Sequence, residues 1–196
     1  MIYKIIFIIF FISIAVFPQS KDTLYYLTAE LGAGYSRYIT TLDNQDLNQS
    51  GFSGTIRIMW HPEHLLSLGL ETGYQYLYSF KSTYTVSGVG TSDVSASMYS
   101  VPIMGIYSMK IFPSSLPNFE LKISSGIFLL YNRGEAFGDE IISSQISIGY
   151  SAAATYLHPL NDLFSIGGEL KYFYISKIQD ADLSLQVVFS YNFFQY

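Results

Sequence analysis

Residues 56–80 show a strict two-residue alternation of apolar and polar side chains, which few folds can accommodate. Before a short turn, Ile56, Ile58 and Trp60 share one face, and Arg57 and Met59 lie on the other. After the turn the apolar face continues with Leu66, Leu68, Leu70, Tyr74, Tyr76 and Tyr78. A period of two indicates β-strands, and a membrane-crossing strand needs about nine to eleven residues, against about five or six in most globular strands. We therefore predict a long hairpin that closes into a larger sheet.

The same pattern recurs along the chain and predicts eight strands. They are residues 24–40, the two strands of the 56–80 hairpin, residues 96–112, 118–132, 144–157 and 163–177, and a last strand from residue 183. Tight turns alternate with polar, mostly longer connections at residues 41–50, 81–94 and 133–142, and a brief acidic turn at 179–182. This alternation is typical of barrels whose short turns face the periplasm. The pattern predicts an all-β, eight-stranded antiparallel up-and-down transmembrane β-barrel, with the longer connections outside the cell.

The composition agrees with strands that face lipid. Hydrophobic residues make up 49% of the chain and charged residues 13%, against about 25% charged in ordinary soluble proteins. After residue 20 no apolar run approaches the roughly 18 residues of a membrane helix, so the apolar groups must be arranged by alternation. The net charge of −5 and the lack of a basic patch argue against nucleic acid as a partner. The absence of cysteine excludes disulfides, thiolate metal sites and a lipid-modified N-terminal cysteine.

The first twenty residues read as a targeting segment. Lys4 precedes an apolar run at residues 5–17, and Pro18, Gln19 and Ser20 follow it. This order is that of a secretory signal peptide, although no small-x-small motif defines the cleavage site. We predict a cleaved signal peptide at residues 1–20 and an outer-membrane β-barrel domain at residues 21–196. The alternative is an N-terminal membrane anchor, for which the apolar run is short.

Seven charged residues lie on the polar faces of the predicted strands. They are Glu30, Arg57, Glu71, Glu120, Lys122, Glu169 and Lys171. The lumen of an eight-stranded barrel is just wide enough to be filled by side chains, and an unpaired buried charge is costly. We therefore predict a structural network of paired charges in a lumen that long side chains fill; the alternative is a proton or ion path. The long inward residues are Arg57, Met59, Lys122, Phe128, Glu169, Lys171 and Phe173.

Aromatic residues gather at the ends of the predicted strands. Such rings favour a membrane interface, where one edge is wet and the rest is apolar. One girdle would contain Tyr25, Trp60, Phe119, Tyr156 and Phe193, and the other Tyr35, Tyr78, Tyr99, Tyr131 and Tyr174. The alternative is a soluble lipocalin-like binding protein with its apolar face inward. Low charge and long strands favour the membrane protein.

The chain resembles the small outer-membrane β-barrel (porin-family) proteins of Bacteroidetes-type Gram-negative bacteria. The resemblance covers about residues 22–196 and rests on the segments 30–35 and 99–104, the Ser-x-Gly-x-Glu strands at 67–71 and 165–169, and the aromatic last strand. It implies location in the cell outer membrane, with membrane lipids, lipopolysaccharide and the barrel-assembly machinery as partners, and no cofactor. One departure is that Tyr196 is out of phase with Phe193. It predicts either a bulge near residues 192–195 or a different reading of the insertion signal.

No catalytic or metal site is expected. The three histidines, His61, His64 and His158, lie in predicted turns beside Pro62 or Pro159, where a polar ring needs no chemical role. We therefore do not expect an enzyme, although some small outer-membrane barrels modify lipids. The acidic outer connections are interpreted as solvated, the alternative being bridges to lipopolysaccharide through divalent cations. The expected role is structural or interactive through the outer loops; the alternative is a narrow pore or a component of a secretion machinery.

Overall fold

The computed structural model describes residues 25–40, 47–86, 90–136 and 139–195, so the predicted signal peptide lies outside the described residues. Within these ranges the chain forms nine strands, and no helix is long and apolar enough to cross a membrane. The strands are β1 (Tyr26–Ile39), β2 (Leu47–Asn48), β3 (Ser50–His61), β4 (Leu66–Val86), β5 (Gly90–Met109), β6 (Phe119–Ala136), β7 (Asp139–Pro159), β8 (Phe164–Ile175) and β9 (Asp180–Gln195).

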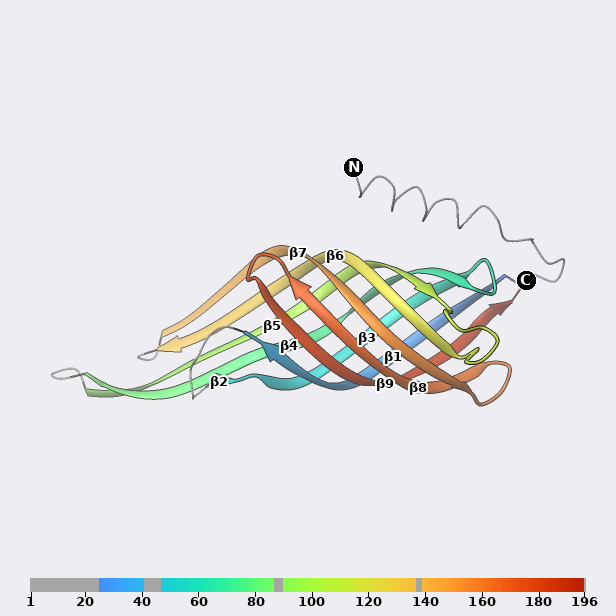
Figure 1. The fold of residues 1–196 in the computed structure, drawn as a ribbon. Helices are drawn as coiled ribbons and strands as arrows, with labels where there is room; N and C mark the ends of the chain where they lie inside the picture. The colour runs from blue at the N-terminus through green and yellow to red at the C-terminus, as the bar shows by residue number, and fades with distance from the viewer. Residues whose placement is uncertain (1–24, 41–46, 87–89, 137–138, 196) are drawn as a thin grey trace.

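The strands form one closed antiparallel ring (Figure 1). Around it the order is β4, β3, β1, β9, β8, β7, β6 and β5, and pairing of β4 with β5 closes it. The two-residue β2 continues the line of β3, because both pair with β4: Leu47 pairs with Phe80, and Ser53 pairs with Gln75. These pairings differ in register by one residue, so β2 and β3 act as one interrupted strand. The predicted eight-stranded up-and-down barrel is therefore confirmed.

Two strand pairs extend far beyond the expected ends, and the predicted loops at residues 81–94 and 133–142 are wrong. β4 and β5 stay paired as far as Val86 and Gly90, and β6 and β7 as far as Ala136 and Asp139. The Ser- and Thr-rich sequence stabilises this pairing across the strands, with Thr83 Oγ1 donating to Asp93 Oδ1 at 2.7 Å. We call the end with these two hairpins the hairpin end (Figure 1). The opposite end, where β1 begins and β9 ends, is the turn end.

The two faces of the sheet have opposite chemistry. Leu31, Ile56 and Leu70 point outward and are 55%, 54% and 71% exposed, whereas Glu30 and Arg57 point inward and are 2% and 1% exposed. An apolar outer surface around a charged interior suits a barrel in lipid, since lipid is the solvent for the outer face. This arrangement excludes a calyx with its apolar face inward.

Aromatic side chains follow the outer surface in a belt towards the hairpin end. Phe52, Tyr74, Tyr99 and Tyr131 contact one another in turn across β3 to β6, with ring centroids 6.4, 5.4 and 5.1 Å apart. Tyr150 and Tyr174 stack at 5.0 Å on β7 and β8. We call these six residues the tyrosine belt.

Tyr78 does not belong to the tyrosine belt, so its predicted girdle position is wrong. A β-bulge between Tyr76 and Tyr78 leaves Leu77 unpaired with β5 and changes the phase of β4. Leu77 is fully buried, and Tyr78 packs against the buried Tyr38 with ring centroids 5.7 Å apart.

Two sequence irregularities have local consequences for pairing. Pro102 lies where the β4–β5 pairing is interrupted, between the pairs Thr72–Ile103 and Gln75–Ser100, as expected for a residue without an N–H. On β9 the pairing shifts after Asn192, so Phe193 is an extra residue and Phe194 pairs with Leu27. The predicted bulge near residues 192–195 is therefore present, whereas Tyr196 lies outside the described residues.

Candidate functional site

Arg57 is the centre of a buried cluster of charges in the lumen. Its Nε lies 2.5 Å from Glu71 Oε2 and its Nη1 lies 3.0 Å from Glu30 Oε2. The guanidinium also binds Glu169 with two nitrogens, Nη1 at 2.7 Å from Oε2 and Nη2 bonded to Oε1. Arginine suits this position because its planar group offers five donors in a fixed arrangement. One side chain of β3 thus joins carboxylates from β1, β4 and β8.

Two lysines complete the cluster. Lys122 Nζ donates to Glu30 Oε2 at 2.7 Å and lies 3.9 Å from Glu169, and Lys171 Nζ binds Glu71 Oε1. Thr155 Oγ1 donates to Glu169 Oε2 at 2.8 Å. The lumen charge network, as we call it, contains Glu30, Arg57, Glu71, Lys122, Glu169 and Lys171. Its three acids and three bases sum to zero charge when all are ionised.

Glu120, the seventh charged residue predicted for the lumen, lies apart from this network. It is 7% exposed, and its Oε2 accepts a hydrogen bond from Ser108 Oγ at 2.8 Å. It forms no ion pair with any residue that the structure describes. The structure therefore brings six of the seven predicted residues together and leaves Glu120 nearer the turn end.

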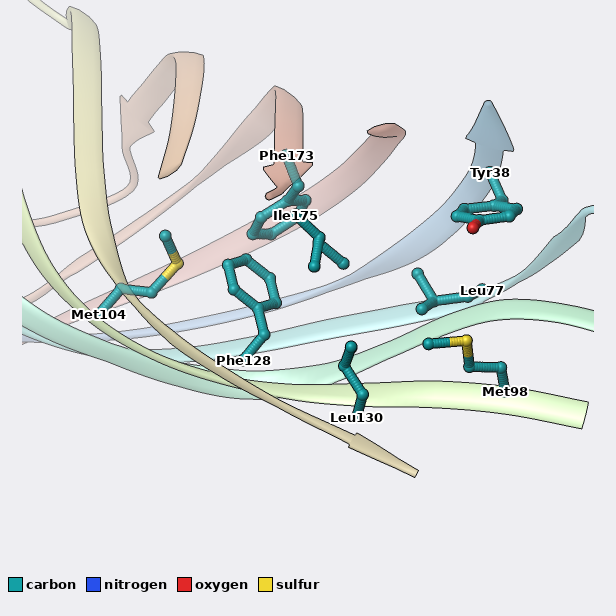
Figure 2. Close-up of a cluster of buried hydrophobic side chains, with 8 residues drawn as sticks. All are labelled: Tyr38, Leu77, Met98, Met104, Phe128, Leu130, Phe173 and Ile175. Carbon is teal, nitrogen blue, oxygen red and sulfur yellow. The ribbon is translucent and has the colours of Figure 1, made fainter. Parts of the chain in front are cut away.

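Two further groups of side chains fill the lumen next to the charge network, and they contact one another, since Asp182 pairs with both Tyr38 and Phe173. The first is polar: Thr55 Oγ1 donates to Gln186 Oε1 at 2.9 Å, and Gln75 Nε2 donates to Asp182 Oδ1. The second is an apolar plug of eight buried side chains (Figure 2). Its members are Tyr38, Leu77, Met98, Met104, Phe128, Leu130, Phe173 and Ile175.

Glycines on the inner face make room for these long side chains. A Cβ atom on Gly149 would lie 2.9 Å from Cδ2 of the Phe128 ring, and one on Gly69 would lie 2.5 Å from Met59 Sδ. Real Cβ atoms essentially never come this close to another atom. The inner glycines therefore accommodate long side chains from the neighbouring strands and do not leave an open channel.

His61 is a buried histidine that the sequence interpretation wrongly placed in a turn. It was expected in a solvated turn but is the last residue of β3 and is 5% exposed. Its Nε2 lies 3.0 Å from Thr28 Oγ1, its Nδ1 lies 2.6 Å from Ser67 Oγ, and its ring stacks on Tyr26 at 4.1 Å. The sequence did carry a sign of this burial, because His61 shares the inward face of the two-residue alternation with Arg57 and Met59. His64 is exposed in a turn, as predicted, whereas His158 is exposed but lies within β7, paired with Ile166, so its predicted turn position is wrong.

Cavities occur at both ends of the barrel. One of about 340 Å³ at the turn end is lined by His61, Lys110 and Glu120 among others. Another of about 420 Å³ lies on the hairpins, lined by Lys81, Asp93 and Glu135 among others. Arg133 Nε on the same hairpins lies 2.6 Å from Glu140 Oε1, with both side chains exposed. Among the described residues no group of three or more histidine and acidic side chains is placed to hold a metal.

Solved structures of outer-membrane proteins share this fold at low sequence identity. Neisserial surface protein A aligns at a TM-score of 0.54 and 15% identity, covering 88% of this chain and 100% of that one. Ail of Yersinia pestis, in complex with the heparin analogue sucrose octasulfate, aligns at 0.52 and 14%, covering 87% and 99%. A major outer membrane protein of Thermus thermophilus aligns at 0.52 and 16%, covering 86% and 99%.

Sequence comparison identifies the family. No curated protein sequence matches the chain. The family model described as outer membrane protein beta-barrel domain matches residues 5–193. The apolar outer face, the closed antiparallel ring and this match agree: the chain belongs to the outer membrane protein beta-barrel domain family and is an integral protein of the outer membrane.

Proposed function

We propose that this protein carries no solute through its lumen and acts by presenting its hairpin end to the outside of the cell. The observation that supports the proposal is the filled lumen. The largest fully buried side chains point into it from three strands: Arg57 on β3, Lys122 and Phe128 on β6, and Lys171 and Phe173 on β8. A neutral charge network and the apolar plug beside it leave no hydrated path, because an ion would have to displace both.

The proposed orientation follows from the family architecture. In outer-membrane barrels the short turns face the periplasm and the longer connections face outward. Here the β4–β5 and β6–β7 hairpins rise beyond the tyrosine belt as one continuous sheet, since β5 pairs with β6 as far as Val94 and Ala136. The hairpin end is therefore the surface available to partners, which supports an interaction role over a transport role.

Planar-bilayer recording tests the closed lumen. The purified, refolded protein is expected to give no steady conductance at the size of a general porin, and a porin of known conductance serves as the positive control. A variant that empties the plug, Phe128→Ala with Phe173→Ala, tests whether the plug matters, and it is expected to increase brief current events. Steady porin-size conductance of the unmodified protein would refute the proposal and favour the narrow-pore alternative.

A further inference from the structure

One strand of the hairpin sheet has an unpaired edge. β7 pairs with β6 from Asp139 onward, but its pairing with β8 begins only at Gly149. The last backbone–backbone hydrogen bond on the β8 side of the described residues is donated by Ser176 N to Ile148 O at 3.0 Å. Beyond it, Lys177 N donates to Ser147 Oγ at 3.0 Å, and the chain then turns back into β9. Among the described residues no strand pairs with this side of residues 139–146. We call this stretch the β7 edge.

The direction of the free backbone groups follows from that last bond. In a strand, the N–H and C=O of one residue point to the same side and those of the next residue to the other. Because the Ile148 C=O points toward β8, the N–H and C=O groups of Glu140, Ile142, Ser144 and Ile146 also point to the unpaired side. The odd-numbered residues of this stretch face β6, opposite Leu130, Asn132 and Gly134.

The β7 edge has few of the features that protect edge strands. Natural edges are usually short, twisted away or protected by lysine and proline. Residues 139–146 contain neither residue type, and Ile141, Ile142 and Ile146 are 70%, 71% and 62% exposed. The stretch begins beyond Tyr150 of the tyrosine belt, on the hairpin side. It thus combines unpaired hydrogen-bonding groups with exposed apolar side chains.

We propose that the β7 edge is a docking site for an extended, positively charged polypeptide segment that adds a strand beside β7. The proposal rests on the proposed function, since it requires the hairpin end to face outward. Strand addition takes affinity from main-chain hydrogen bonds and specificity from alternate side chains. Here Ile142 and Ile146 contact apolar residues of the segment, and the acidic residues at the hairpin tip attract its basic residues.

The charges at the end of the β6–β7 hairpin favour this occupant over a second copy of the chain. Glu135, Asp139 and Glu140 lie near the end of the β6–β7 hairpin, and Arg133 is bonded to Glu140. Two copies in one membrane point the same way, so their β7 edges would meet in parallel with identical acidic ends side by side. Like charges opposite one another destabilise strand pairing. A basic segment forms opposite-charge pairs instead.

Peptide binding to the full chain in lipid nanodiscs tests the site. The probe is a fluorescent octapeptide of alternating valine and lysine. Its controls are the valine–glutamate peptide and the same valine–lysine peptide N-methylated at alternate residues, which removes the donors of one edge. Fluorescence anisotropy is expected to show binding of the first peptide only. Amide hydrogen exchange at residues 142, 144 and 146 is expected to be fast in the free protein and to slow when that peptide binds.

Matched variants separate edge pairing from general attraction. Ser144→Pro removes an N–H that points to the free side and leaves the β6 ladder intact, so it is expected to weaken binding roughly tenfold. Ser144→Ala keeps the N–H and is expected to bind as the unmodified protein does. Ile142→Pro is the second variant, and an unchanged heat-modifiable migration shows that each variant is folded.

Several results would overturn the proposal. The first is binding of the glutamate peptide or the N-methylated peptide as tight as that of the valine–lysine peptide. The second is unchanged peptide binding by both proline variants when they are folded. The third is slow amide hydrogen exchange at residues 142, 144 and 146 of the free protein, at a rate that changes with protein concentration. The last result would assign the edge to a second copy of the chain. If the peptide does not bind but the protein shows no conductance, only the docking site is rejected. If the protein shows porin-size conductance but binds the peptide specifically, only the closed lumen is rejected.

Discussion

Replacement of Arg57 by methionine tests whether the lumen charge network depends on this one guanidinium. The substitution keeps an unbranched side chain in the lumen but removes every bond to Glu30, Glu71 and Glu169. The network then has three acids and two bases, and Glu169 retains only Thr155 at 2.8 Å and Lys122 at 3.9 Å. Removing one partner of a buried ion pair costs about 3–5 kcal/mol, so we expect the free energy of unfolding to fall by about that amount.

The measurement is equilibrium unfolding in urea from lipid vesicles, followed by the fluorescence of Trp60, the one tryptophan of the chain. Arg133→Met is the matched control, because this arginine is 65% exposed and pairs with an exposed Glu140. An exposed ion pair contributes about 0–1 kcal/mol. A loss for Arg57→Met no larger than that for Arg133→Met would refute the reasoning.

A double variant tests whether Arg57 and Glu169 stabilise the barrel through their mutual contact. Arg57→Met with Glu169→Gln restores equal numbers of acids and bases, so its loss should be smaller than the sum of the two single losses. Neighbouring residues of one network couple by about 0.5–3 kcal/mol. Strict additivity would show that Glu169 and Arg57 act independently, contrary to their bidentate contact.

Three further predictions concern the rest of the barrel. His61→Ala should lower the free energy of unfolding by about 1–3 kcal/mol, because it leaves the hydroxyls of Thr28 and Ser67 without their buried partner. His158→Ala is the control and should have little effect, because His158 is exposed. Equal losses for the two variants in the same urea assay would contradict the buried position of His61. Gly34→Ala should reduce the refolding yield, measured by heat-modifiable migration, because the new Cβ would lie 2.6 Å from Gln186 Cα. Gly105→Ala is the control and should refold normally, because the nearest atom to its Cβ is Ser125 O at 4.0 Å. For orientation, a cysteine at Thr85 should react with a membrane-impermeant thiol reagent on intact cells and one at Asn161 should not; the reverse labelling would invert the proposed topology.

The sequence was sufficient to predict the barrel and its two faces. Period-two alternation fixes which residues share a face, and a lipid-exposed outer surface requires the apolar face of every strand to point the same way. Leu31, Ile56 and Leu70 therefore lie where expected. The ends of the long hairpins were missed because Ser and Thr occupy both faces beyond the membrane, so the apolar marker disappears although the pairing continues.

The details of the lumen were harder to predict. Alternation identified the inward charges but not their partners, because Arg57 and Glu169 come from strands that are not neighbours in the ring. The bulge at Leu77 reversed the phase for Tyr78, and no local residue pattern marks it. His61 was assigned to a turn although its phase placed it inward, which shows that phase was the better guide at a strand end.

The connectivity of the lumen charge network has a consequence for assembly. Glu30 on β1 binds Lys122 on β6, and Arg57 on β3 binds Glu169 on β8, so these pairs form only when distant parts of the chain meet. An unfinished sheet leaves such charges uncompensated, and their transfer into lipid is costly. The lumen charge network becomes neutral only when the ring closes. The unpaired charges therefore disfavour insertion of an open intermediate into the membrane and favour insertion of the completed barrel.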